Sequence, residues 1–181
     1  MTEKIALKTS VKLGVVPTHV KFMGGLVPDE QGRLPRSDGG KLLVLTEMAT
    51  LVEQSLVRIS SCQISVFSGV EPEDNDEMIN GLKALGLEVH LILMVGGADP
   101  MNPAHEDAVV GMLVDGLSLA KRHGIEQVAS TSIEEWMKAG ASPKVGEEFD
   151  DAVAQNVKVH TRAYQEADLA SSGIKAWHIE F

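Results

Sequence analysis

Two residues near the carboxyl end of the chain are the strongest candidates for chemistry. The segment Trp177-His178-Ile179-Glu180-Phe181 has the composition of a β-strand. Because side chains alternate along a strand, His178 and Glu180 share one face and the three apolar residues share the other. A carboxylate on a buried sheet face is costly unless it meets a metal ion or another cation. We therefore expect a ligand-binding role for Glu180, with His178 beside it as a substrate contact.

Polar residues also follow the first two apolar runs of the chain. His19 and Lys21 come just after the run 11–16, and Ser68 follows the run 62–67. In parallel α/β folds, reactive groups lie in the loops beyond the carboxyl ends of the strands. A histidine and a lysine there can bind an anionic or hydroxylated ligand, so His19, Lys21 and Ser68 are candidate substrate contacts. The alternatives are a solvated loop for the first two and simple turn chemistry for Ser68, which precedes a glycine.

A third loop and the single cysteine are weaker candidates for a functional site. Gly96-Gly97 follows the run 87–95 and would let a ligand approach the backbone, with a helix starting near Asn102. Neither GxGxxG nor GxxxxGK[ST] occurs in the chain, and turn geometry alone explains the two glycines. Cys62 has no base beside it in the sequence and is interpreted as a small core residue.

Short apolar runs alternate with segments of helical period. The runs are rich in Val and Ile, as in buried strands, whereas the longer segments space their apolar residues by three and four. Strands are predicted at 11–16, 62–67, 87–95, 127–129 and 174–181, and helices at 41–59, 73–85, 103–123 and 149–167.

This alternation predicts an α/β fold with parallel strands and right-handed crossovers. It amounts to about four βα units plus a fifth strand, roughly the first part of an eightfold barrel. We therefore expect a partial TIM barrel, with residues 1–181 forming a single domain.

The composition excludes several classes of function. Sixteen basic against 26 acidic residues give a net charge of −10, which disfavours binding to nucleic acids or to an anionic membrane surface. No apolar run approaches the ~20 residues that span a bilayer, and the charged start is unlike a signal peptide. A single cysteine fits a reducing compartment. These features predict a soluble, cytoplasmic protein.

The helix–strand pattern that closes the chain resembles that of the xylose-isomerase-like TIM barrels, which include sugar isomerases, ketose 3-epimerases and related enzymes. The amphipathic segment 149–167 leads through Ala170-Ser-Ser-Gly-Ile into a strand that ends in Ile179-Glu180. In that superfamily the fifth strand commonly ends in a glutamate that binds a divalent metal (Mn, Mg, Co or Zn).

The resemblance implies that Glu180 is a metal ligand and a catalytic carboxylate acting on a sugar or a similar hydroxy-ketone. The family's remaining metal ligands come from the sixth to eighth strands, which are not present in this sequence. We therefore expect weak or no metal binding by the isolated chain and no isomerase activity, because divalent ions require several donors.

Two alternatives remain open on the sequence alone. The chain could be a complete open sheet of the flavodoxin or Rossmann type, binding a nucleotide near Gly96-Gly97 or acting as a non-catalytic module. It could also be a half-barrel that completes itself by pairing with a copy, as a homo-oligomer, because a sheet of five parallel strands has two exposed edges.

Overall fold

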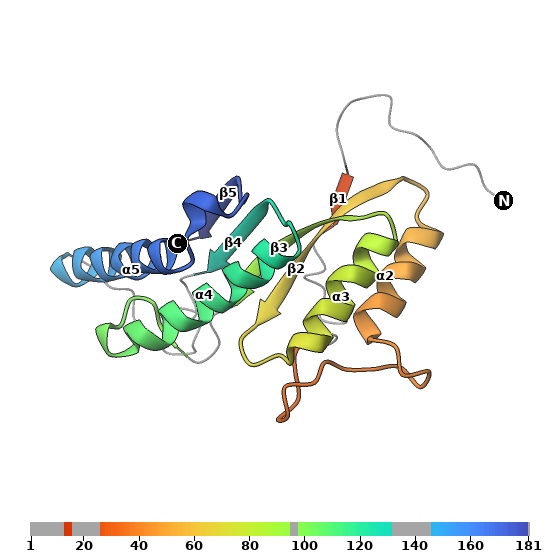
Figure 1. The fold of residues 1–181 in the computed structure, drawn as a ribbon, viewed down its shortest axis with the longest axis horizontal. Helices are drawn as coiled ribbons and strands as arrows, with labels where there is room; N and C mark the ends of the chain where they lie inside the picture. Colours follow the sequence, from red (N-terminus) through yellow and green to blue (C-terminus); the bar gives the residue numbers. More distant parts are fainter. Residues whose placement is uncertain (1–12, 16–25, 95–97, 132–145, 181) are drawn as a thin grey trace. The chain divides into compact units, whose positions relative to one another are not determined.

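A computed structural model describes residues 13–15, 26–94, 98–131 and 146–180 of the chain (Figure 1). Strands alternate with helices along the sequence, and neighbouring strands pair in parallel. The predicted α/β class with parallel strands is therefore confirmed. The chain divides into two compact units, Met1–His90 and Leu91–Phe181.

The first unit combines a parallel strand pair with two helices. Strand β1 (Leu13–Val15) pairs with β2 (Ile59–Phe67). Helices α2 (Leu43–Gln54) and α3 (Pro72–Ala84) lie side by side (Figure 1). Buried apolar side chains form the core of this unit, including Val44, Met48, Ile64, Met78, Ile79 and Leu82.

The boundaries of α2 and β2 differ from the sequence prediction. Helix α2 was expected over 41–59, but it ends at Gln54 because Ser55 adopts an extended backbone conformation. Strand β2 was expected from Cys62 and instead begins at Ile59, which is buried. Apolar residues at the junction fit either period, so the pattern alone did not separate helix from strand.

The second unit contains most of β3 (Glu88–Met94), together with β4 (Gln127–Thr131) and β5 (Ala176–Glu180). Leu91, Ile92 and Leu93 pair with Val128, Ala129 and Ser130. All five residues of β4 pair with β5, from Gln127 opposite Ala176 to Thr131 opposite Glu180. Strand β4 is thus two residues longer than the predicted 127–129, and β5 is shorter than the predicted 174–181.

Two long helices cover one face of this second set of strands. Helix α4 (Glu106–Arg122) follows a short 3-10 turn, η1 (Pro103–His105), and packs beside α5 (Glu147–Glu166) (Figure 1). The Asn102 side chain caps η1 by accepting a hydrogen bond from the Ala104 N–H. Gly124 has a φ of +59° just beyond the helix, where a residue without Cβ is favoured.

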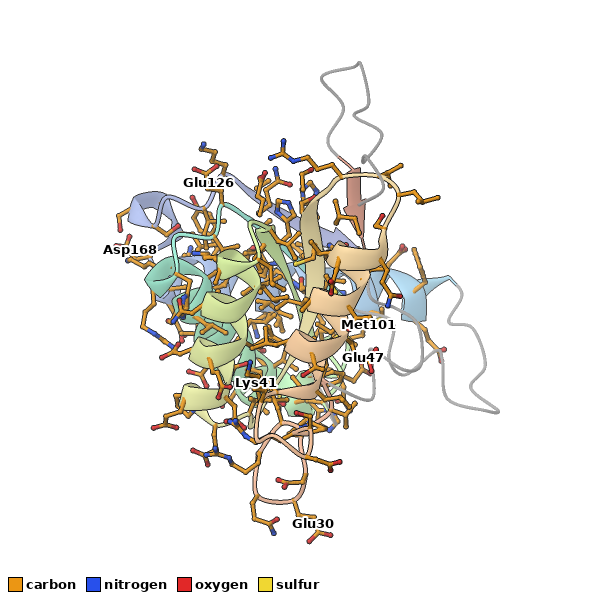
Figure 2. The ribbon with its side chains drawn as sticks, turned by 90° about the vertical axis from the view of Figure 1, so that its right-hand side faces the viewer. Glu30, Lys41, Glu47, Met101, Glu126 and Asp168 are labelled. Carbon is orange, nitrogen blue, oxygen red and sulfur yellow. The ribbon has the colours of Figure 1, made fainter. Side chains whose placement is uncertain are left out.

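The distribution of polar and apolar side chains is that of a globular α/β protein. Exposed charged residues such as Glu30, Glu126 and Asp168 lie on the outside of the ribbon (Figure 2). Cys62 is buried, and burial raises the pKa of its thiol to about 12, which agrees with a core role. A search of the described helices finds none with the length and apolar content that crossing a bilayer requires.

Close packing of α4 against β3 depends on a residue without a side chain. A Cβ added at Gly116 would lie 2.6 Å from Leu93 Cδ2 and 3.0 Å from Leu93 Cδ1. Leu93 is itself buried, so it has little room to move. By contrast, a Cβ at Gly111 on the same helix meets nothing within 4 Å.

We predict that Gly116→Val lowers the free energy of unfolding by about 1–3 kcal/mol, because the added carbon atoms overpack the α4–β3 contact. Gly111→Ala is the matched control and should raise it by about 0.5–1 kcal/mol through helix propensity. Urea denaturation followed by circular dichroism measures both changes. Equal stability of the wild type and Gly116→Val would contradict the described packing.

Candidate functional site

The register of β4 and β5 assigns two sequence-predicted site residues to one face of the sheet. His178 is opposite Ala129, and Glu180 is opposite Thr131 at the carboxyl ends of the two strands. His178 is exposed. Strand positions 178 and 180 therefore belong to the same face, with small or short residues as cross-strand neighbours. This face is opposite to the one that α5 contacts.

A buried polar network defines which face α5 covers. The Ser130 hydroxyl lies 3.0 Å from His160 Nε2, and the Trp177 indole Nε1–H donates to Ser130 Oγ at 3.0 Å. The His160 and Trp177 ring centroids are 5.1 Å apart. His160 comes from α5, Ser130 from β4 and Trp177 from β5, so one hydroxyl joins all three elements.

The partners of His160 determine which ring nitrogen carries the proton. Nδ1 lies 2.9 Å from the Asn156 carbonyl oxygen, which can only accept, so Nδ1 is the protonated nitrogen. Nε2 is then the acceptor, and the Ser130 hydroxyl donates to it. Burial lowers the pKa of His160, and the hydrogen bond to Asn156 offsets this only in part. His160 is therefore held as a neutral imidazole.

A serine hydroxyl that donates to an imidazole is the geometry of an activated nucleophile. Ser130, however, is fully buried and His160 is 4% exposed, so no substrate reaches the hydroxyl. The Ser130–His160–Trp177 cluster is structural: it holds α5 on β4 and β5. The sequence signal for this cluster is a histidine on the apolar face of the predicted helix 149–167, whereas Ser130 follows the predicted strand 127–129 directly.

Asn156 lies one helical turn from His160 and is also buried, at 1% exposure. Neither its Oδ1 nor its Nδ2 has a hydrogen-bond partner among the described residues. An amide that is buried without partners costs free energy. Asn156 is thus the least satisfied side chain on the face of α5 that packs against the strands.

The other predicted site residues lie in the first unit or outside the described residues. Ser68 is exposed and lies in the turn after β2, in the first unit. His19, Lys21 and Gly96-Gly97 lie outside the described residues. Within the described part of the second unit, the predicted positions 178 and 180 lie on one face of β5.

We tested whether the residues present fit a divalent metal. Within the part of the chain that the structure describes, no three His, Cys, Asp or Glu residues form a group that could hold an ion. His178 and Glu180 offer one imidazole and one carboxylate, whereas zinc usually takes about four ligands and harder divalent ions about six. The donors among the described residues of one chain therefore do not complete a metal site.

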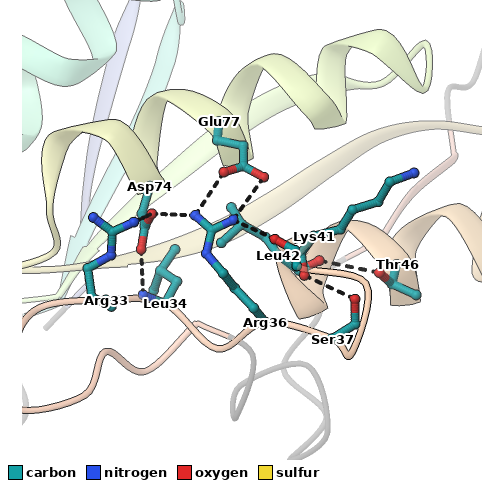
Figure 3. Close-up of polar contacts among 10 residues, drawn as sticks. Arg33, Leu34, Arg36, Ser37, Lys41, Leu42, Thr46, Asp74 and Glu77 are labelled. Carbon is teal, nitrogen blue, oxygen red and sulfur yellow. Dashed lines mark hydrogen bonds and ion pairs between the residues drawn. The ribbon is translucent and has the colours of Figure 1, made fainter.

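Two further clusters of charged residues consist of ion pairs and hydrogen bonds between their own members. In the first unit, the buried Asp74 accepts from the Leu34 N–H at 2.7 Å and from the Arg36 guanidinium at 2.6 Å (Figure 3). Arg33 is a further cation at 2.9 Å, and Arg36 also pairs with Glu77 at 2.8 Å. Burial pushes the pKa of Asp74 upward, but these partners outweigh it, so the pKa lies below its ordinary value. The cluster attaches the segment 26–42 to α3.

A second cluster joins α4 to α5. Glu106 accepts from Lys158 at 2.7 Å and from Gln155 at 3.1 Å, and these hydrogen bonds lower the pKa of Glu106 to about 2. Arg162 pairs with Asp107 at 2.6 Å and with Glu166 at 2.7 Å. Each charge in this cluster faces an opposite one, so the cluster fixes one flank of α5 against α4.

The neutral state of His160 makes stability depend on pH. The unfolded chain takes up a proton at its ordinary pKa of about 6.5, whereas the folded chain does so only at a lower pH. We predict that the free energy of unfolding falls as pH decreases below about 6.5, by about 1.4 kcal/mol per unit of pKa lowering.

His160→Gln supplies the control, because glutamine can keep polar contacts but does not titrate. Denaturant titrations of both proteins between pH 7.5 and pH 5 should show a smaller pH dependence for the variant. The same slope in both proteins would mean that His160 is not held neutral.

The chain was also compared with known proteins. No protein-family model matches it, and the search of curated proteins finds no match.

Proposed function

We propose that the chain supplies the first βα units of a metal-dependent sugar isomerase or epimerase with a barrel of the xylose-isomerase type. The observation that carries this proposal is the position of Glu180. It lies at the carboxyl end of β5, paired with the end of β4 and on the face that α5 leaves free. This is the edge where parallel α/β enzymes bind their substrates.

In this proposal the residues have distinct roles. Glu180 is the metal ligand and the catalytic carboxylate that exchanges a proton at the carbon next to a carbonyl group. His178, Ser68, His19 and Lys21 contact the hydroxyl groups of a sugar or a related hydroxy-ketone. The exposure of His178 supports a contact role, because an exposed imidazole is accessible to a polar ligand. The further metal donors lie outside the described residues of one chain.

The proposal predicts weak binding of Mn²⁺ by the dilute chain, with a dissociation constant roughly in the millimolar range, because few donors are present. Glu180→Gln should weaken this binding about tenfold, a factor typical of residues at metal sites. Glu126→Gln is the control, since Glu126 is an exposed carboxylate just before β4, at the other end of the strands. Electron paramagnetic resonance of free Mn²⁺ measures the bound fraction.

If Glu180→Gln binds Mn²⁺ as well as the wild type does, Glu180 is not a ligand and the proposal fails. Mn²⁺-independent binding of a nucleotide, measured in the same samples by calorimetry, would favour the open flavodoxin-like or Rossmann-like domain instead.

We also predict no turnover by the 181-residue chain. An incomplete donor set cannot both hold a metal and orient a substrate. Proton NMR in D₂O with Mg²⁺ and a panel of ketoses should show no exchange at the carbon next to the carbonyl above the rate without protein. If the wild type catalyses this exchange and Glu180→Gln abolishes it, the site of the 181-residue chain is complete and the prediction is wrong.

A further inference from the structure

The 27–36 loop, which precedes α2 in the first unit, forms an open cavity of about 630 Å³. Sites for small molecules usually have volumes of roughly 300–1,000 Å³ and combine an apolar wall with a few polar groups. The wall of this cavity has that composition, because apolar side chains alternate in it with two guanidinium groups and one carboxylate. The lining includes Val27, Pro28, Asp29, Arg33, Pro35 and Arg36.

This loop lies at the carboxyl end of β2. The Glu71 N–H donates to the Gly32 carbonyl oxygen at 2.8 Å, which joins the loop to the turn that follows β2. Gly32 has a φ of +77°, and a Cβ there would collide with the Gly69 carbonyl oxygen, so the two backbones are in direct contact. Parallel α/β folds bind their ligands beyond the carboxyl ends of the strands.

Hydrogen bonds on both sides of Arg33 fix the backbone of the loop. Oδ1 of Asp29 accepts from the Gln31 N–H at 3.0 Å and from the Arg33 N–H at 2.8 Å. The next N–H, that of Leu34, donates to the buried Asp74 at 2.7 Å. Arg33 is therefore held in a loop that is already ordered, which reduces the entropy lost when a ligand binds.

Arg33 has N–H groups that are available to a ligand. The Arg36 guanidinium donates to the Gly40 carbonyl oxygen at 2.7 Å, to Asp74 at 2.6 Å and to Glu77 at 2.8 Å. Within the described ranges, the Arg33 guanidinium has a single partner, Asp74 Oδ1, at 2.9 Å from one of its nitrogens (Figure 3). The Arg33 side chain is 46% exposed. Because a guanidinium has five N–H donors, several of them can meet a ligand in the cavity.

The charges around the cavity favour a ligand with a single negative charge. Arg33 and Arg36 are accompanied by three carboxylates, those of Asp29, Asp74 and Glu77. Each of these carboxylates already accepts from N–H groups, but together they would repel a doubly charged phosphate. A carboxylate has one charge, and its planar shape matches the fork of a guanidinium.

We propose that this cavity binds a small organic acid that has one carboxylate and a compact apolar body, and that Arg33 binds the carboxylate. Val27, which is 47% exposed, and the rigid rings of Pro28 and Pro35 supply apolar surface for the body of the ligand. The site contains neither Glu180 nor a metal ion, so it goes beyond the proposed function and is independent of it.

Benzoate is a suitable probe, because it combines one carboxylate with a compact ring. Proton–nitrogen NMR of the whole chain, titrated with benzoate in the absence of metal, should show saturable shifts concentrated at residues 27–36. We expect a dissociation constant of about 1–10 mM, since so small a ligand makes few contacts. Benzamide, which is neutral, should bind at least about tenfold more weakly, because charge-assisted hydrogen bonds to arginine are lost. Phenyl phosphate should bind no better than benzoate.

Two variants with matched controls test the assigned residues. Arg33→Gln should raise the dissociation constant of benzoate about tenfold. Arg58→Gln removes the same charge from an exposed residue just before β2 and should leave binding unchanged. Val27→Asp should also weaken binding about tenfold, because it adds a like charge beside the carboxylate. Leu56→Asp is its control, since Leu56 is 66% exposed and outside the cavity lining.

Circular dichroism shows whether each variant is folded, and if Arg33→Gln is not, Val27→Asp decides. The absence of saturable shifts at residues 27–36, or benzoate binding that the decisive variant leaves unchanged, overturns the site. Equal binding of benzamide overturns the role of the carboxylate, and tighter binding of phenyl phosphate overturns the preference for a single charge. None of these results depends on Glu180, which the Mn²⁺ measurement tests separately.

Discussion

The arrangement of the second unit depends on one buried hydroxyl. Ser130 accepts from the Trp177 indole and donates to His160, so a single side chain connects two strands to the helix that covers them. This contact decides which face of β5 is covered. With Trp177 on the side of α5, position 178 belongs to the opposite face, where an exposed histidine and a strand-end glutamate share an edge. The face on which positions 178 and 180 lie therefore follows from the packing of Trp177 and His160 on the opposite face of β5.

Ion pairs hold one flank of α5 against α4. Opposite charges on Lys158, Arg162, Glu106 and Asp107 fix α5 against α4. On the opposite flank Val157 is 53% exposed.

Periodicity in the sequence predicted the order of strands and helices and the shared face of His178 and Glu180, because both follow from local alternation. It did not predict the full length of β4, since Ser130 and Thr131 are polar and Ser130 is stabilised inside by residues far away in sequence. The ion pairs between α4 and α5, and the cluster around Asp74, likewise join distant segments. Such contacts depend on tertiary packing, and the local sequence pattern does not predict them.

The most direct test of this account is the protonation state of the His160 ring. Two-dimensional proton–nitrogen NMR of the histidine rings, recorded through acid pH, identifies which nitrogen carries the proton. We expect a neutral ring protonated at Nδ1, with Nε2 accepting a hydrogen bond, that persists below the ordinary histidine pKa of about 6.5. A His160 ring protonated at Nε2, or one that titrates at about 6.5, would contradict the network that orients β5.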